Sequence, residues 1–239
     1  MLWGYFHGLS EPGFYVDLGA NHPVDDSVTH FFYERGWSGV NVEPNKELSQ
    51  KIKENRPRDI NLNIGIADKN GTASFRQYSA HGLSSFSEYH KQGYADADND
   101  GTRAFKDVKT TVRTLKNVLK KHAKETIHFL KIDIEGFEHQ ALSSNDWNTF
   151  RPWVICIESP PGSDKKWQTL LKKASYLPHM YDGLNEYYVA AEQKKLMDTY
   201  HVFTASGSVH ISSVSGQQSF AHRARNKLSR FAKPTKKLR

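Results

Sequence analysis

The segment FYVDLGAN, residues 14–21, decides the fold of this chain. An apolar run that ends in a glycine is typical of a parallel strand that turns directly into a helix. Gly19 lets another backbone or a bound molecule approach the turn closely, because glycine has no side chain. The turn holds a single glycine and therefore departs from the G-x-G-x-x-G pattern that cradles the pyrophosphate of dinucleotides.

Short apolar runs and amphipathic stretches alternate downstream of this segment. We expect strands at 39–43, 60–64, 72–78, 127–134 and 153–158, and helices at 27–35, 45–55, 114–122, 136–143 and 165–174. Asp26 or Ser27 is expected to cap the first of these helices. Residues 79–107 contain three glycines and many polar groups, which predicts a long loop or lid. The alternation predicts an α/β fold, with a mostly parallel sheet and helices on both of its faces.

The last strands of the sheet carry further information. Residues 176–181 and 186–190 flank the turn DGLN and are predicted to form a hairpin, which reverses one strand at the C-terminal end of the sheet. A fully parallel dinucleotide-binding sheet has no such strand. The reversed strand is typical of the Rossmann-like sheet of class I S-adenosylmethionine-dependent methyltransferases.

Charge divides the chain into two parts. The protein has 239 residues and a formal net charge of +7, with 33 Lys and Arg against 26 Asp and Glu. Eight of the basic residues follow Asp198, after which no acidic residue occurs, so residues 1–222 carry about as many negative as positive charges. We therefore predict a catalytic domain over 1–205 and a basic tail over 206–239, partly disordered or an amphipathic helix. A near-neutral body argues against a nucleic-acid partner.

The tail and the cysteine count suggest where the protein acts. Phe220, Ala224, Leu228 and Phe231 would share one helical face among basic residues, a pattern that suits an anionic membrane surface or a partner domain. A disordered tail is the alternative. Cys156 is the single cysteine, and no signal peptide or long apolar run is visible. We expect a cytoplasmic protein, peripheral at the inner membrane face if the tail binds lipid.

Two acidic residues suit a nucleoside with a cationic side chain. Asp17 could hold an amine, and Asn21 offers both donors and an acceptor. Glu43 stands at the end of the second expected strand, 26 residues after Asp17. A carboxylate at this place can accept hydrogen bonds from both ribose hydroxyls.

The segment KIDIEGFEH, residues 131–139, carries the candidate catalytic groups. The carboxyl ends of parallel strands form the ligand crevice of open α/β sheets, and this segment lies at such an end. Removing a proton from a weakly nucleophilic hydroxyl needs a base, for which Asp133, His139 and Glu158 are the candidates. His139 could equally face solvent. We predict no metal site, although a divalent ion held by Asp133 and Glu158 remains open.

Several segments together resemble the FkbM family of methyltransferases. They are FYVDLGANHP at 14–23, GWSGVNVEP at 36–44 and KIDIEGFE at 131–138, with RTL at 113–115 and Arg151-Pro152 in the same order. The resemblance spans roughly residues 13–190 and implies S-adenosyl-L-methionine as cofactor. It further implies O-methylation, often of a glycan or glycan precursor in polysaccharide biosynthesis. The cofactor contacts it implies are Asp17, Gly19, Asn21, Glu43, Asn45 and Asp68.

Other readings of the sequence remain open. Residues 96–101, DADNDG, with Asp107 at the twelfth position, imitate a calcium loop but lack its final glutamate. The segment SPPG at 159–162 imitates the loop of amine methyltransferases that act on nucleobases, but glycine replaces the stacking aromatic. The alternatives to glycan methylation are methylation of a small natural product, an NAD-dependent oxidoreductase, and a non-catalytic module of a glycan-assembly complex.

Overall fold

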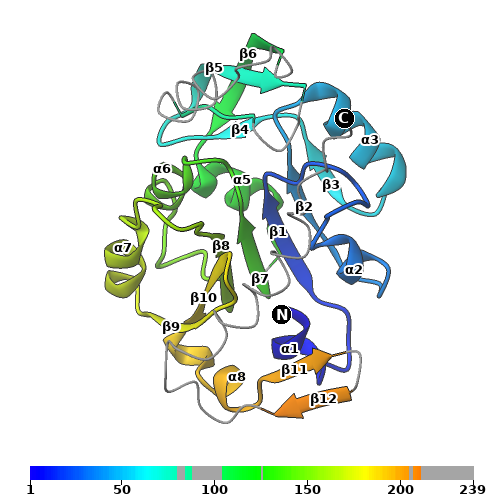
Figure 1. Cartoon of the computed structure of the whole chain (residues 1–239), viewed down its shortest axis with the longest axis vertical. Helices are drawn as coiled ribbons and strands as arrows, with labels where there is room; N and C mark the ends of the chain where they lie inside the picture. Colours follow the sequence, from blue (N-terminus) through cyan, green and yellow to red (C-terminus); the bar gives the residue numbers. More distant parts are fainter. Residues whose placement is uncertain (80–83, 88–103, 125, 205–206, 211–239) are drawn as a thin grey trace, which may run out of the picture.

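The computed structural model describes residues 1–79, 84–87, 104–124, 126–204 and 207–210. Its centre is a seven-stranded sheet in the order β3-β2-β1-β7-β8-β10-β9 (Figure 1). The strands are β1 (Phe14–Leu18), β2 (Ser38–Val42), β3 (Ile60–Leu62), β7 (Phe129–Ile132), β8 (Val154–Glu158), β9 (Tyr176–Tyr181) and β10 (Asn185–Ala190). β3, β2, β1, β7 and β8 run parallel, and β10 runs antiparallel to β8. The predicted fold class and its reversed strand are confirmed.

β1 is buried along its whole length, so other elements cover both faces of the sheet at this strand. Val16 and Leu18 pack with α5 (Leu115–His122), α6 (Glu138–Ser143) and α7 (Trp167–Lys173) on one face. Tyr15 packs on the other face with α1 (Trp3–Phe6) and Phe32 of α2 (His30–Tyr33). Side chains alternate along a strand, so Asp17 shares the face of Tyr15.

A set of buried polar side chains, which we call the Arg56 cluster, lies on the α2 face of β1 and β2. Its members are Tyr15, Thr29, Asn41, Arg56 and Asp59, all fully or almost fully buried. Arg56 ends α3 (Lys46–Asn55), and its guanidinium donates to Asp59 at 2.9 Å and to Tyr15 at 2.7 Å. The same guanidinium donates to Thr29 and Asn41, while Asp59 also accepts from the backbone N–H of Gly39. The buried charges are thus paired and hydrogen-bonded.

A second, three-stranded sheet lies beside the C-terminal ends of the central strands, at the top of Figure 1. It contains β4 (Gly65–Ile66), β5 (Gly71–Tyr78) and β6 (Phe105–Arg113). The sequence predicts β5 but places the start of β6 in a loop. Asp107 lies in β6 and forms a two-pronged ion pair with Arg76 on the paired strand, at 2.8 and 2.9 Å. It is therefore part of a strand pair; residues 96–101 of the calcium-like pattern lie outside the described residues.

The first predicted helix is shorter than expected. It spans His30–Tyr33 rather than 27–35, and neither Asp26 nor Ser27 caps it. Asp26 has a positive φ of 57°, which breaks the helical path, and the Ser27 hydroxyl accepts a hydrogen bond from Arg56. Val28 and Phe31 are about 40% exposed.

The first residues pack against the end of the described chain. α1 contacts β11 (His201–Thr204), which pairs with β12 (Gly207–His210). Tyr200 is fully buried, and its hydroxyl donates to the backbone carbonyl of Met1. Short helical turns η2 (Ala191–Gln193) and α8 (Lys195–Asp198) lead to this contact.

The tail predicted over 206–239 lies almost wholly outside the described residues, and so does its expected amphipathic helix at 220–231. Within the described part of the chain, no helix has the length and apolar character that a bilayer crossing requires.

Candidate functional site

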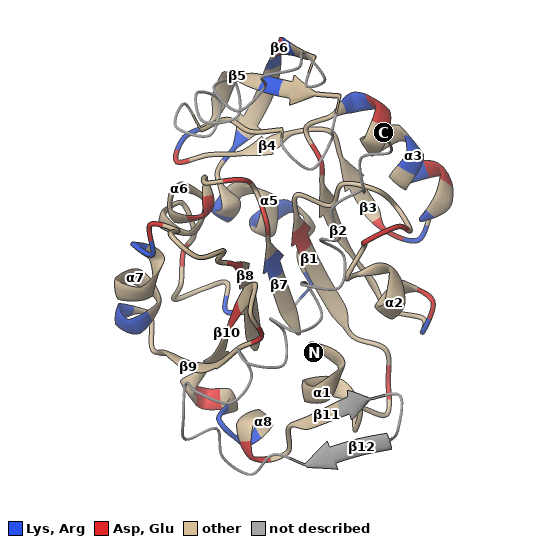
Figure 2. Cartoon of the chain, in the orientation of Figure 1, with Lys and Arg blue, Asp and Glu red and all other residues tan. Residues whose placement is uncertain are grey.

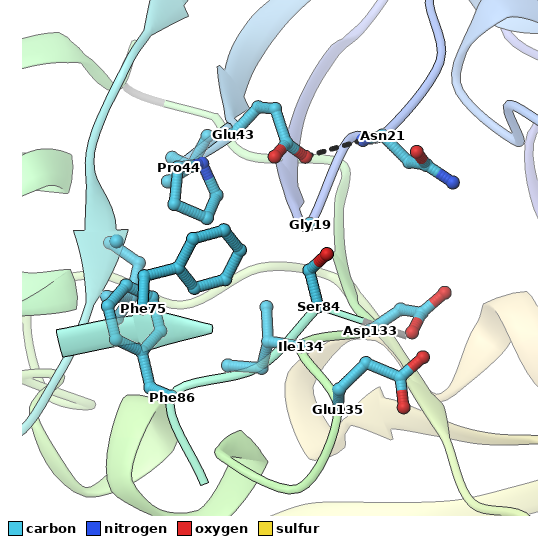
Figure 3. A pocket seen from close by; sticks show the side chains of 13 residues that line it. Gly19, Asn21, Glu43, Pro44, Phe75, Ser84, Phe86, Asp133, Ile134 and Glu135 are labelled. Carbon is cyan, nitrogen blue, oxygen red and sulfur yellow. Dashed lines mark hydrogen bonds between the residues drawn. The ribbon is translucent and has the colours of Figure 1, made fainter. Parts of the chain in front are cut away.

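A cavity opens at the carboxyl ends of β1, β2 and β7. This edge of the sheet is where open α/β folds bind their ligands. It is lined by Gly19, Asn21, Val42, Glu43, Pro44, Gly65, Ile66, Phe75, Ser84, Phe86, Asp133, Ile134 and Glu135. Figure 3 shows Glu43, Pro44 and Phe75 toward one end of the cavity, and Asp133 and Glu135 toward the other.

Glu43 is held rigidly at the first end. One carboxylate oxygen accepts from the backbone N–H of Asn21 and the other from that of Asn45, each at 2.8 Å. Asn21 reaches this position with a left-handed φ of 52°, a conformation that asparagine tolerates. Burial raises the pKa of Glu43 to about 7, although the two N–H donors oppose the shift. Each oxygen keeps a lone pair for a further donor, such as a ribose hydroxyl.

Gly19, directly after β1, packs tightly against the residue that follows β7. Its φ is +80°, and a Cβ atom at this position would lie 1.8 Å from the backbone carbonyl oxygen of Asp133. A side chain at position 19 would therefore separate the two strand ends. The turn predicted from this glycine forms one wall of the cavity.

Asp17 lies beneath the cavity and is not among its lining residues. Its side chain is 1% exposed; one oxygen accepts from the Thr29 hydroxyl at 2.7 Å, and the other faces the Lys131 ammonium at 3.4 Å. Alternation along β1 turns Asp17 toward the face of the Arg56 cluster. A direct contact between Asp17 and a cofactor amine does not fit this geometry.

Lys131 joins the two sides of the site. Its ammonium donates to the backbone carbonyl of Gly19 at 2.9 Å and lies 3.4 Å from both Asp17 and Asp133. In Figure 2 the blue band on β7 lies beside the red band on β1. Burial by itself would lower the pKa of Lys131, but the two carboxylates outweigh it and raise the pKa above its usual range.

Three carboxylates meet at the other end of the cavity. Asp133, Glu135 and Glu158 each have an oxygen within 4.8 Å of the others. Partial burial, together with the charge of Asp133 and a hydrogen bond to it, raises the pKa of Glu158 to about 8. Glu158 is therefore protonated at neutral pH and can donate to its neighbour. Such oxygens are ligands of divalent ions, yet their proximity alone does not define a metal site.

Glu135 is a site residue that the sequence analysis did not select. It has a left-handed φ of 53°, and two side chains hold its turn. The Ser85 hydroxyl donates to the Glu135 carbonyl at 2.6 Å, while the Glu138 carboxylate accepts from the N–H groups of Ile134 and Gly136. The signal in the sequence is the E-G pair directly after Asp133-Ile134.

Two aromatic side chains from the second sheet region close the Glu43 end. Phe75 comes from β5, and Phe86 follows it in the chain; their ring centroids are 4.8 Å apart. Phe86 lies so close to Gly65 that a Cβ atom there would be 2.4 Å from its ring. With Pro44 these rings form an apolar wall (Figure 3). Neither aromatic was identifiable from sequence, since nothing local distinguishes them from core residues.

Three other predicted site residues do not line the cavity. The Asn45 side chain caps α3 by accepting from the backbone N–H groups of Glu47 and Leu48, so it serves the helix. Asp68 is exposed after β4, outside the cavity lining. His139 lies on α6 and borders a separate surface groove with Trp147 and Lys173. The structure thus places His139 at this groove and not in the lining of the cavity that contains Asp133.

The strand order, the reversed β10 and the cavity at the strand ends define a class I methyltransferase fold. The sequence profile of the Methyltransferase FkbM domain matches residues 17–198, most of the chain. The protein therefore belongs to the FkbM methyltransferase family, and the predicted resemblance is confirmed. No curated protein gives a significant match.

Proposed function

We propose that this methyltransferase uses S-adenosyl-L-methionine to methylate a hydroxyl group of a glycan or glycan precursor. The observation that supports this most is Glu43, a buried carboxylate fixed by two backbone N–H groups at the edge of the cavity. Its remaining lone pairs suit the two hydroxyls of a ribose. The family match supports methyl transfer, while the cofactor and the O-linked product are part of this proposal.

The rest of the cavity fits the proposed cofactor in its chemistry. Phe75, Phe86 and Pro44 offer an apolar surface to a purine, next to the carboxylate that would hold its ribose. Asn21 and the Gly19 turn supply polar groups toward the centre.

When bound, S-adenosylmethionine supplies an electrophilic methyl group carried on a sulfonium. The chain itself must orient an acceptor hydroxyl and remove its proton as the new C–O bond forms. Asp133 is the base in this proposal: it lines the cavity, and the Lys131 ammonium lies 3.4 Å from its carboxylate. Glu158, protonated at neutral pH, donates to Asp133 and keeps it oriented. Asp133 accepts the hydroxyl proton and later releases it to water.

Calorimetry with S-adenosylhomocysteine tests the cofactor assignment. The wild-type protein should bind it, and Glu43→Ala should weaken binding at least several-fold, because the charge-assisted bonds to the ribose are lost. Glu54→Ala, an exposed change on α3, is the matched control and should bind as wild type. Absence of binding by wild type, with the protein folded, would refute the proposal.

A radiolabelled methyl assay tests the reaction. Extracted glycans should acquire label from S-adenosylmethionine, and Asp133→Asn should reduce the rate by about 10²-fold or more, as expected for loss of a general base. Equal labelling by both proteins would remove Asp133 from the catalytic role.

We also propose that the basic tail holds the enzyme at an anionic membrane surface or a partner domain. Support comes from its eight basic residues and apolar stripe in the sequence. Sedimentation with phosphatidylserine vesicles, with and without residues 211–239, tests the membrane alternative. Equal binding by both chains would refute it.

A further inference from the structure

Among the residues that the structure describes, the cavity lining contains no positively charged side chain. Of the 13 lining residues, Glu43, Asp133 and Glu135 are acidic, and none is lysine, arginine or histidine. Glu158 lies within 4.8 Å of the last two. An acceptor whose hydroxyl reaches Asp133 must therefore pass or contact at least one further carboxyl group.

The nearest described cation cannot offset this charge. Lys131 is almost fully buried, and its ammonium already faces Asp17, Asp133 and the Gly19 carbonyl. One positive charge is thus shared between two carboxylates. Lys165, on the loop that follows Glu158, is paired with Glu186 at 2.6 Å.

Resting on the proposed function, we propose that the acceptor carries no negative charge beside the methylated hydroxyl. The substrate class is a neutral or amino sugar, and uronic acids and sugar phosphates are excluded. Carboxylates are strong acceptors for the hydroxyls of a neutral sugar and for an ammonium group. An acidic sugar at the same place would meet like charge in a partly desolvated cavity, which disfavours it well over tenfold.

Glu135 is the residue that imposes this restriction. It lines the cavity, whereas Glu158 is not among the lining residues and is protonated at neutral pH. Ser85 and Glu138 fix the backbone of the turn that carries the Glu135 side chain. We assign it no part in proton transfer, which allows its charge to be changed without removing the base.

A panel of acceptor sugars tests whether the enzyme prefers neutral or amino sugars to acidic ones. Methyl transfer is measured for methyl glucoside, glucosamine, glucuronic acid and glucose 6-phosphate, and for an extracted glycan pool whose labelled product is hydrolysed to monosaccharides. Label should fall on neutral or amino sugars, at least tenfold above the acidic ones. Label found mainly on a uronic acid or a sugar phosphate would overturn the inference.

Charge reversal tests the role of Glu135. Glu135→Lys should raise the rate ratio of acidic to neutral acceptors at least tenfold, with Glu135→Gln between it and wild type; because the ratio is taken within each variant, a change in cofactor affinity does not affect it. Glu54→Lys, far along α3, is the matched control and should leave the ratio unchanged. An unchanged ratio in Glu135→Lys would overturn the assignment. Binding of S-adenosylhomocysteine without label on any sugar would instead refute glycan methylation itself, and this inference with it.

Discussion

The Arg56 cluster and the Asp133–Glu135–Glu158 carboxylates differ in how their charges are compensated. In the first, every charged group is buried and meets an opposite charge or several hydrogen-bond partners. In the second, like charges lie within 4.8 Å of one another, and one is kept neutral by a raised pKa. The first arrangement stabilises the junction of β1, β2 and α3. The second costs stability and offers proton-accepting groups to the cavity, which is typical of functional sites.

The largest expected effect lies in the Arg56 cluster. Arg56→Met should lower the free energy of unfolding by about 3–5 kcal/mol, because it leaves Asp59 as an unpaired buried charge. Urea denaturation measures the loss. Lys53→Met, an exposed change one turn earlier in the same helix, should cost under about 0.5 kcal/mol. Similar losses in both variants would contradict the distinction between the two regions.

Removing a carboxylate from the Asp133–Glu135–Glu158 set should have the opposite effect on stability, and this effect should grow with pH. The folded protein keeps a proton on Glu158 up to a pKa of about 8, whereas the unfolded chain releases it near 4.5, so stability falls as pH rises between these values. Glu158→Gln should match wild type near pH 4 and be more stable at pH 9. Screening at this partly exposed group limits the gain to about 1–2 kcal/mol.

Thermal unfolding at several pH values measures this effect. Glu54→Gln is the control on α3 and should show no pH-dependent difference from wild type. A stability difference between Glu158→Gln and wild type that does not grow with pH would show that Glu158 titrates normally in the folded protein.

The smallest effect concerns the backbone of the same region. Glu135→Gly should raise the free energy of unfolding by up to about 1 kcal/mol, because glycine adopts a positive φ without the Cβ penalty and removes a like charge. Glu135→Ala removes the charge but keeps the Cβ atom, so the difference between the two variants isolates the backbone contribution. Equal stability of the two would mean that the turn is not strained.

The fold was largely predictable because its central strands are continuous apolar runs. β1, β7 and β8 are buried on both faces, and the turn DGLN indicates the hairpin that reverses β10. β6 was missed because FKDVKTTVR is mostly exposed and rich in lysine, and its partner β5 lies about 30 residues earlier. No local sequence pattern indicates that these two strands pair.

Site residues that lie at the ends of strands were predictable from the sequence. Those whose position depends on tertiary packing were not. Gly19, Asn21, Glu43 and Asp133 come directly after strands or at their ends, and they meet at one cavity. Asp17 and His139 have suitable chemistry but face elsewhere, since strand register and helix rotation decide their direction. Phe75 and Phe86 reach the cavity only through the second sheet and the segment beside it.

The contact between α1 and Tyr200 bears on the order of folding. The hydrogen bond from Tyr200 to Met1 joins residues 199 positions apart, and a four-residue helix has no stability of its own. This contact closes a loop that spans almost the whole domain, and α1 otherwise packs on the face of the sheet that carries Tyr15 and Phe32. We expect α1 to dock after the central strands have assembled and to open before them, so that its amides exchange with solvent long before those of β1.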